Sequence, residues 1–191
     1  MIEIHDDVIS EDLQNKILKD VQSNYFSWYL NDDTTGYGRE NFFSSNIKEY
    51  LQFCHLYYAW DNEKQICYKN SNTEIVDKII EDISNFFKWE KCEIYRVKAN
   101  LQTQFAENHK SYFNTPHVDF HTKTNTTMIY YINDSDGDTL FFDNRNDLNI
   151  VKRVSPKKGR LVVFDTNIYH TGQHPIKSNK RIVLNINAQT I

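Results

Sequence analysis

Hydrophobic positions in the first half of the chain recur at a helical spacing. A helix is predicted over about 10–23, with Ser10 in the position of an N-terminal cap. The apolar stripe of this helix is Leu13, Ile17, Leu18 and Val21. A second helix is predicted over about 73–88, where a continuous stripe of Ile, Val and Phe follows Thr73. Both stripes are typical of helices that pack one face against a core.

From Cys92 onward the period falls to two, as in strands with one buried face. The predicted strands span about 92–99, 126–133, 138–143, 149–154, 160–165 and 181–188. Turn residues separate them, which is typical of a sandwich or barrel and not of alternating βαβ units. Residues 31–48 are turn-rich and are expected to be a loop. We therefore expect an α+β fold in one domain over 1–191, with a helical flank over about 1–91 and a strand-rich core over about 92–191.

Length and composition agree with a globular protein. A chain of 191 residues is long enough for a sizeable core, and its 14% aromatic content with few Gly and Pro excludes a disordered or fibrous class. The N-terminus is acidic, and no run of roughly 18 apolar residues follows, so neither a signal peptide nor a membrane span is expected. Cys54, Cys67 and Cys92 form no C-x-x-C pair and are expected to be reduced thiols in a cytoplasmic protein.

Charge is distributed unevenly around the net value of −4. The second half holds a basic cluster, Lys152, Arg153, Lys157, Lys158 and Arg160. Such a cluster can attract an anionic substrate or nucleic acid, although solubilising charge on a solvated hairpin is the favoured interpretation. Nucleic acid is therefore a possible but not a favoured partner.

The candidate chemistry lies in His117-Val118-Asp119, followed by His170 and, after ten intervening residues, by Arg181. Residues i and i+2 of a strand point to the same side, so His117 and Asp119 can converge on one ion. A third ligand from a distant strand would complete the two-histidine, one-carboxylate face of non-haem Fe(II) oxygenases. His121 and His174 are competing candidates, but only His170 lies at this interval from Arg181.

The surrounding residues carry a family resemblance. The runs TMIYYIN (127–133), GDTLFF (137–142) and PKKGRLVVF (156–164) resemble the 2-oxoglutarate/Fe(II)-dependent dioxygenases. The prolyl-4-hydroxylase-like branch, in its compact bacterial and phage versions, is the most similar, and the resemblance covers about 92–189. It implies a double-stranded β-helix, or jelly roll, flanked by the N-terminal helices.

The resemblance also implies roles for particular residues. Fe(II) would be held by His117, Asp119 and His170, and 2-oxoglutarate and O2 would be the cosubstrates. Arg181 would bind the distal carboxylate of 2-oxoglutarate, because a buried arginine needs an anion and its planar fork fits a carboxylate. Tyr131 would assist Arg181, and Asn100 either reaches the cosubstrate or is an ordinary residue at the edge of the core.

One position departs from the family pattern. Many members carry Ser or Thr two residues after the arginine, where this chain has Val183. The implied reaction is hydroxylation of a C–H bond, with a peptidyl, prolyl-type substrate favoured. The alternatives are a nucleic-acid demethylase or hydroxylase, an enzyme acting on a small metabolite, and a catalytically silent jelly-roll binding module. No oligomeric state is predicted.

Overall fold

The computed structural model describes residues 1–32, 50–61, 63–64, 66–70, 72–106, 113–119, 125–144 and 147–191. Two helices and eleven strands lie within this part of the chain. In chain order they are β1 (Ile2–His5), α1 (Glu11–Val21), β2 (Tyr29–Asn31), β3 (Gln52–Asp61), β4 (Ile66–Lys69), α2 (Glu74–Phe87), β5 (Cys92–Thr103), β6 (Asn125–Tyr131), β7 (Thr139–Asn144), β8 (Asp147–Val154), β9 (Leu161–Asp165), β10 (His170–Gly172) and β11 (Lys180–Thr190).

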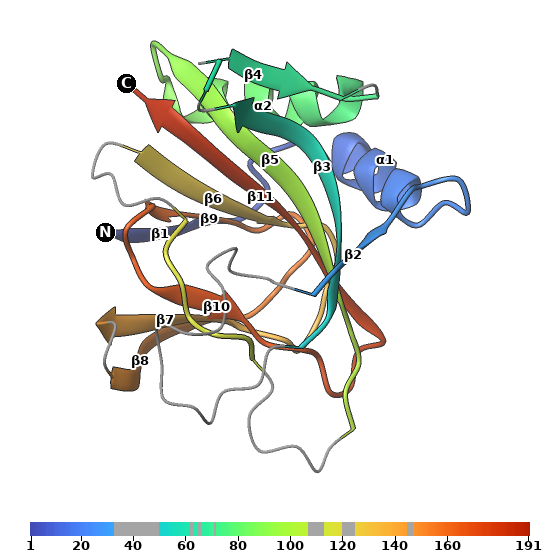
Figure 1. Cartoon of the computed structure of the whole chain (residues 1–191). Coiled ribbons are helices and arrows are strands. Elements are labelled where there is room, and N and C mark those ends of the chain that lie inside the picture. Colours follow the sequence, from blue (N-terminus) through green and yellow to red (C-terminus); the bar gives the residue numbers. More distant parts are fainter. Residues whose placement is uncertain are drawn as a thin grey trace.

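The strands form two antiparallel sheets. The large sheet has the order β1-β9-β6-β11-β5-β3-β2, with β4 paired to β3, and the small sheet has the order β10-β7-β8. Figure 1 shows the small sheet at one end of the molecule and the two helices at the other, with the strands of the large sheet between them. This arrangement is the double-stranded β-helix that the sequence predicted, in a mostly antiparallel fold with two helices.

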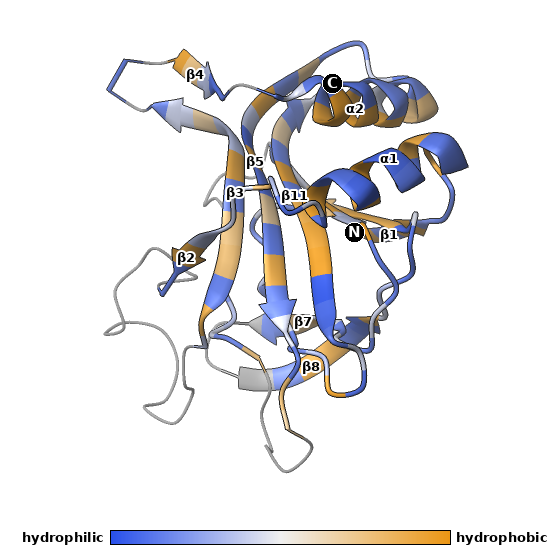
Figure 2. Cartoon of the chain, turned by 90° about the vertical axis from the view of Figure 1, so that its right-hand side faces the viewer, coloured by the Kyte–Doolittle hydropathy of each residue, from blue (hydrophilic) through white to orange (hydrophobic). Residues whose placement is uncertain are grey.

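Alternation along β11 divides the large sheet into two faces. Its even-numbered residues Ile182, Leu184 and Ile186 are fully buried in a core that also contains the stripes of α1 and α2. Val183 is buried in a second core, between the sheets. On β6 the same rule places Tyr130 in the first core and Tyr131 in the second. The apolar bands of β5 and β11 and the apolar sides of the helices are visible in Figure 2.

Both predicted helices are confirmed. The side chain of Ser10 accepts a hydrogen bond from the backbone N–H of Leu13 and so caps α1. Thr73 occupies the cap position of α2 without a capping hydrogen bond of its own, because its hydroxyl donates instead to Asp77 over 2.9 Å. The amphipathic pattern is sufficient to specify α2, since Val76, Ile79 and Ile83 are its buried residues.

The expectation of a helical flank over about 1–91 requires a correction. This segment also contributes β1, β2, β3 and β4, all of which belong to the large sheet. Three of these strands have four residues or fewer, too few for a clear alternating pattern. The ten residues of β3 include two runs of four residues of intermediate burial, so they lack a strict alternation of buried and exposed positions. Of the predicted loop over 31–48, residues 33–48 lie outside the described residues.

Two expectations about composition can be compared with the structure. Cys54, Cys67 and Cys92 are all free cysteines. Among the described residues, no helix is long and apolar enough to cross a membrane.

The basic cluster is engaged in contacts within the chain. Arg160 and Lys157 both donate to the carboxylate of Asp6, whose pKa falls to about 2 mainly through these hydrogen bonds. The other three cations also donate within the chain: Lys158 to Asn15, Lys152 to the carbonyl of Ile2 and Arg153 to Gln173. Four of the five cations therefore connect the N-terminal segment to the β8–β9 region, and Arg153 contacts Gln173.

A stability prediction follows from the end of α2. Lys88 ends the helix in the left-handed region, at φ 56° and ψ 38°, where a side chain with a Cβ is strained. Lys88→Gly should raise the free energy of unfolding by about 0.5–1 kcal/mol, because glycine adopts this conformation without that strain. Urea denaturation measures the change. Lys88→Ala is the control, and a glycine variant no more stable than the alanine variant would contradict the prediction.

Candidate metal and cosubstrate site

Backbone pairing brings the two histidines of the predicted triad together. The N–H of His117 donates to the carbonyl of His170 over 3.0 Å, and the N–H of His170 donates back over 2.9 Å. This isolated antiparallel bridge places the two residues directly opposite each other. Asp119 follows two residues after His117, and its N–H donates to the carbonyl of Thr166 over 3.1 Å. Two segments far apart in the sequence thus present three side chains to one point.

The three side chains form a group that is able to hold a metal ion. The ligand atoms of His117, Asp119 and His170 all lie within 4.8 Å of one another. Each imidazole is oriented through its other nitrogen: Nδ1 of His117 lies 3.2 Å from the carbonyl of Thr115, and Nδ1 of His170 lies 2.9 Å from that of Ile168. A backbone partner at Nδ1 fixes the ring and leaves Nε2 for a metal.

The protonation states suit a metal ligand set. Burial and the neighbouring His170 lower the pKa of His117 to about 4, so its imidazole is neutral at neutral pH. Burial opposes ionisation of Asp119, but the charge of Arg96 and a hydrogen bond from Asn187 act against this effect. The pKa of Asp119 is therefore held well below its ordinary value. A carboxylate with two imidazoles is the donor set that suits Fe(II).

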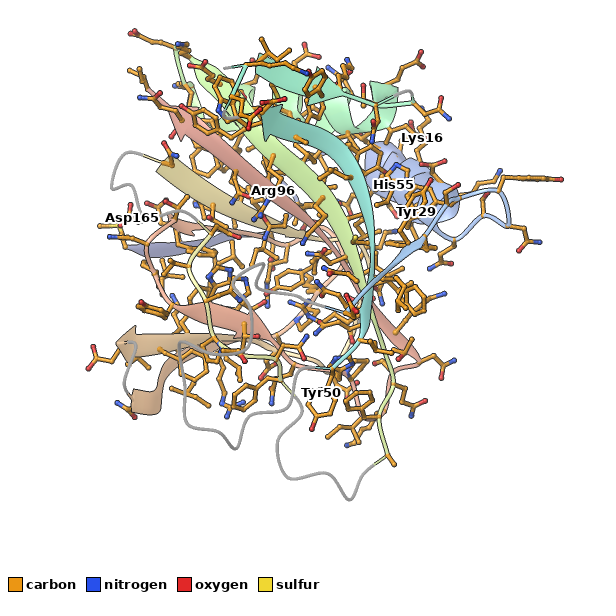
Figure 3. The ribbon with its side chains drawn as sticks, in the orientation of Figure 1. Lys16, Tyr29, Tyr50, His55, Arg96 and Asp165 are labelled. Carbon is orange, nitrogen blue, oxygen red and sulfur yellow. The ribbon has the colours of Figure 1, made fainter. Side chains whose placement is uncertain are left out.

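Three residues that the sequence analysis did not single out hold Asp119 in place. Arg96 Nη2 donates to Oδ1 over 2.5 Å, while Asn187 Nδ2 and Thr127 Oγ1 each donate to Oδ2 over 3.0 Å. Arg96, on β5, is labelled in Figure 3 over the middle of the large sheet. These residues come from three adjacent strands, and only their register brings them to one carboxylate.

Arg181 lies on the inward face of β11 and is 3% exposed. Its guanidinium donates from Nε to the carbonyl of Gly137, from Nη1 to Gln102 Oε1 and from Nη2 to Thr139 Oγ1, over 2.8, 2.9 and 2.7 Å. All of these acceptors are neutral, and within the described part of the chain Arg181 makes no salt bridge. A buried cation with neutral partners is costly unless an anion meets it.

Two glycines leave room for this guanidinium. A Cβ on Gly172 would lie 2.9 Å from both Nη1 of Arg181 and Oε1 of Gln102. A Cβ on Gly137 would overlap the carbonyl of Gln173 and lie 3.1 Å from Cδ of Arg181. The close approach of backbone to side chain explains why both positions lack a side chain.

Tyr131 lies beside Arg181 as the sequence suggested, with the guanidinium carbon 5.6 Å from the centre of its ring. Its hydroxyl lies 2.6 Å from that of Thr139 and donates to the carbonyl of Val154. Burial, the first cause, raises the pKa of Tyr131, so the phenol stays protonated. Val183 stands where Ser or Thr was expected from the resemblance, so it cannot place a hydroxyl next to Arg181. Thr139 of β7 places one there instead.

The metal-binding group and Arg181 line one cavity, whose volume is about 330 Å³. Asn100 also lines it, and its buried Oδ1 has no hydrogen-bond partner among the described residues. The cavity also takes in Lys98, Gln102, Thr139, Val183 and Asn185. Its size falls within the usual range for small-ligand sites.

Of the two competing histidines, His174 lies among the described residues and is separated from this group. His174 stacks on Phe105 with ring centroids 4.0 Å apart, and its Nδ1 lies 3.0 Å from the carbonyl of Thr103. It is not part of the metal-binding group, which contains His170. His121 lies outside the described residues.

Comparison with known proteins agrees with this geometry. The family model of the 2OG-Fe(II) oxygenase superfamily matches residues 103–189. A search of curated proteins finds no match.

Solved structures share the fold at low identity. An oxidoreductase of the 2OG-Fe(II) oxygenase family from Burkholderia pseudomallei has a TM-score of 0.65 at 10% identity, over 98% of this chain and 85% of that one. A prolyl-4-hydroxylase from Pseudomonas putida has a TM-score of 0.56 at 14% identity, over 98% and 91%. A prolyl hydroxylase from Trichoplax adhaerens, in complex with a peptide fragment of hypoxia inducible factor, has a TM-score of 0.59 at 10% identity, over 98% and 83%.

The family match covers His117, Asp119, His170 and Arg181, and the similar structures have the same double-stranded β-helix. Over residues 103–189 the chain is thus similar to the 2OG-Fe(II) oxygenase superfamily, and His117, Asp119 and His170 within this range could hold a metal ion.

Proposed function

We propose that this protein hydroxylates a C–H bond of a peptidyl, prolyl-type substrate, with Fe(II) held by His117, Asp119 and His170 and with 2-oxoglutarate held by Arg181. The observation that carries the proposal is that one cavity joins a three-residue metal-binding group to a buried arginine without a carboxylate partner among the described residues. A dicarboxylate that reaches from the metal to Arg181 supplies the missing anion.

The residues of the chain would divide the work between them. His117, Asp119 and His170 would occupy one face of the metal and leave the opposite face open to cosubstrate and O2. Arg96, Asn187 and Thr127 would keep the Asp119 carboxylate oriented. The metal and 2-oxoglutarate supply the redox chemistry, in which oxidative decarboxylation accompanies hydroxylation of the substrate.

Arg181 would orient 2-oxoglutarate by its far carboxylate. Thr139 and Gln102 hold the plane of the guanidinium, which leaves part of its donor edge for a carboxylate. Tyr131, protonated and buried beneath the arginine, would support this end of the cosubstrate through Thr139. Asn100, which lines the same cavity from β5, would reach the cosubstrate by donating a hydrogen bond from its side-chain NH2 group.

The prolyl-type substrate is supported by the similar structures, two of which are prolyl hydroxylases, one of them bound to a peptide. Nucleic acid is less well supported, since all five cations of the basic cluster already donate to groups of the chain. A silent binding module would have no need of a complete ligand set with oriented imidazoles.

Release of succinate tests the proposed function. The protein with Fe(II), 2-oxoglutarate, O2 and ascorbate should form succinate slowly, and proline-containing peptides should raise the rate and gain 16 mass units. Mass spectrometry of products measures both changes. Free amino acids and oligonucleotides are the comparison substrates. Stimulation by one of these alone would move the substrate to that class, and absence of succinate under all conditions would reject the oxygenase assignment.

The ligand set predicts which substitutions remove the metal. His117→Ala, Asp119→Ala and His170→Ala should each lower bound metal to background, because two ligands do not fix a coordination face. Metal content after incubation with Fe(II) or Mn(II) is the measurement. His174→Ala is the control and should bind one equivalent, provided that circular dichroism shows it folded. Full occupancy in the Asp119 variant would remove that residue from the ligand set.

Substitution of Arg181 is expected to weaken binding of the cosubstrate selectively. Arg181→Ala should weaken 2-oxoglutarate by roughly a hundredfold or more, about 3–5 kcal/mol, because two charge-assisted hydrogen bonds are lost. Metal affinity should change little, since the guanidinium bonds to Gly137, Gln102 and Thr139 and not to the triad. Arg181→Lys should keep part of the affinity. Calorimetry with the Mn(II) form gives both constants, and an unchanged 2-oxoglutarate constant would refute the clamp.

A further inference from the structure

Lys98 is a charged residue in the cavity that the proposed function does not use. It lies on the inward face of β5, where the register pairs it with Asn185 of β11 on one side and Leu56 of β3 on the other. Its side chain lines the cavity. Within the described part of the chain, Lys98 has neither a hydrogen bond nor a salt bridge.

The register places Lys98 at the metal end of the cavity, because its partner Asn185 is two residues from Asn187, which donates to Asp119. Burial lowers the pKa of Lys98, and repulsion by Arg96 lowers it further. A cation buried at this depth gains from an anionic partner.

Lys98 is also far from the arginine that would clamp the cosubstrate. Its partner Asn185 is four residues from Arg181 along β11, roughly 13 Å of strand. The two carboxylates of 2-oxoglutarate are assigned to Arg181 and to the metal in the proposed function. Neither assignment requires Lys98.

A second unpartnered group lies next to the lysine. Asn185 is 6% exposed, and its side-chain oxygen has no hydrogen-bond partner in the described residues. It lines the same cavity. A buried amide without a partner costs free energy unless a ligand satisfies it. The ammonium and the amide therefore form a polar subsite beside the triad.

The charge balance of the cavity favours a further anion. Among the described lining residues three are cationic, Arg96, Lys98 and Arg181, and one is a carboxylate, Asp119. A divalent metal adds two positive charges and the dianionic cosubstrate removes two. The loaded cavity keeps a surplus of two positive charges, which favours an anionic substrate group over a neutral or cationic one at this position.

We propose that the substrate carries a carboxylate close to the C–H bond that is oxidised, and that Lys98 binds this carboxylate. The side-chain oxygen of Asn185 accepts a hydrogen bond from a polar group of the substrate next to the carboxylate. The inference rests on the proposed function, because it requires the metal and 2-oxoglutarate in the same cavity. The carboxylate belongs either to a free amino acid or to an acidic residue beside the target in a peptide.

Matched pairs of probes distinguish these sources. The Mn(II) form, saturated with 2-oxoglutarate, is titrated with the protein amino acids and their α-carboxamides, L-proline and L-prolinamide among them. It is also titrated with blocked peptides that carry Asp or Asn next to proline. In at least one series the carboxylate member should bind roughly ten- to a hundredfold more tightly than its amide, as measured by calorimetry. The series that shows the preference identifies the source.

Variants connect the preference to the residue. Lys98→Met should abolish it and leave the 2-oxoglutarate constant within about threefold of the original value. Lys98→Gln is a second neutral variant in case the first does not fold. Lys16→Met, which removes the same charge from α1, should change neither quantity.

The outcomes separate the two proposals. If the wild-type protein fails to bind metal or 2-oxoglutarate, the proposed function itself fails. If both bind but no carboxylate probe binds better than its amide, only the carboxylate subsite is rejected. The subsite is also rejected if Lys98→Met weakens 2-oxoglutarate as strongly as Arg181→Ala does, because Lys98 would then serve the cosubstrate.

Discussion

The antiparallel pairing of β11 with β5 and β6 is the constraint on which the rest of the structure depends. It sends Ile182, Leu184 and Ile186 toward the helices and Arg181 and Asn185 toward the cavity. A slip of one residue would exchange the faces, bury the guanidinium against apolar side chains and expose the leucine to the cavity. The same packing that stabilises the outer core therefore fixes the register of the site.

The cavity shows how a buried polar site is kept stable in a small protein. Asp119 is satisfied by three donors from three strands, and Arg181 is satisfied by three neutral acceptors. The first arrangement holds a carboxylate ionised, while the second leaves a cation without a counter-charge in the described part of the chain. This difference in charge pairing is what the proposed roles require, with Asp119 as a metal ligand and Arg181 as the residue that binds an anionic ligand.

Lys98 and Asn185 extend the same reasoning to the substrate. They lie on neighbouring strands at the metal end of the cavity. Among the described residues, the ammonium of Lys98 and the side-chain oxygen of Asn185 both lack a hydrogen-bond partner. Their position relative to Arg181 follows from register and not from proximity in sequence. Substrate selection in this protein would then depend on Lys98 and Asn185. These two residues face the cavity, since the opposite face of their strands is apolar and packs in the outer core.

The sequence by itself determined the two amphipathic helices, most strands after Cys92 and the candidate ligands His117, Asp119 and His170, because periodicity and spacing are local properties. It did not reveal the short strands β1, β2, β4 and β10, which contain too few residues for a period. The partners of Asp119 and Arg181 were also decided only by tertiary structure. These partners are ordinary polar residues in the sequence. Register within the large sheet brings Arg96, Thr127 and Asn187 to Asp119 and brings Gln102 to Arg181, whereas Thr139 reaches Arg181 from the small sheet. The hydroxyl next to Arg181 shows this. Val183 has none, and Thr139 of β7 provides it, because a hydrogen bond depends on distance in space and not on separation along the chain.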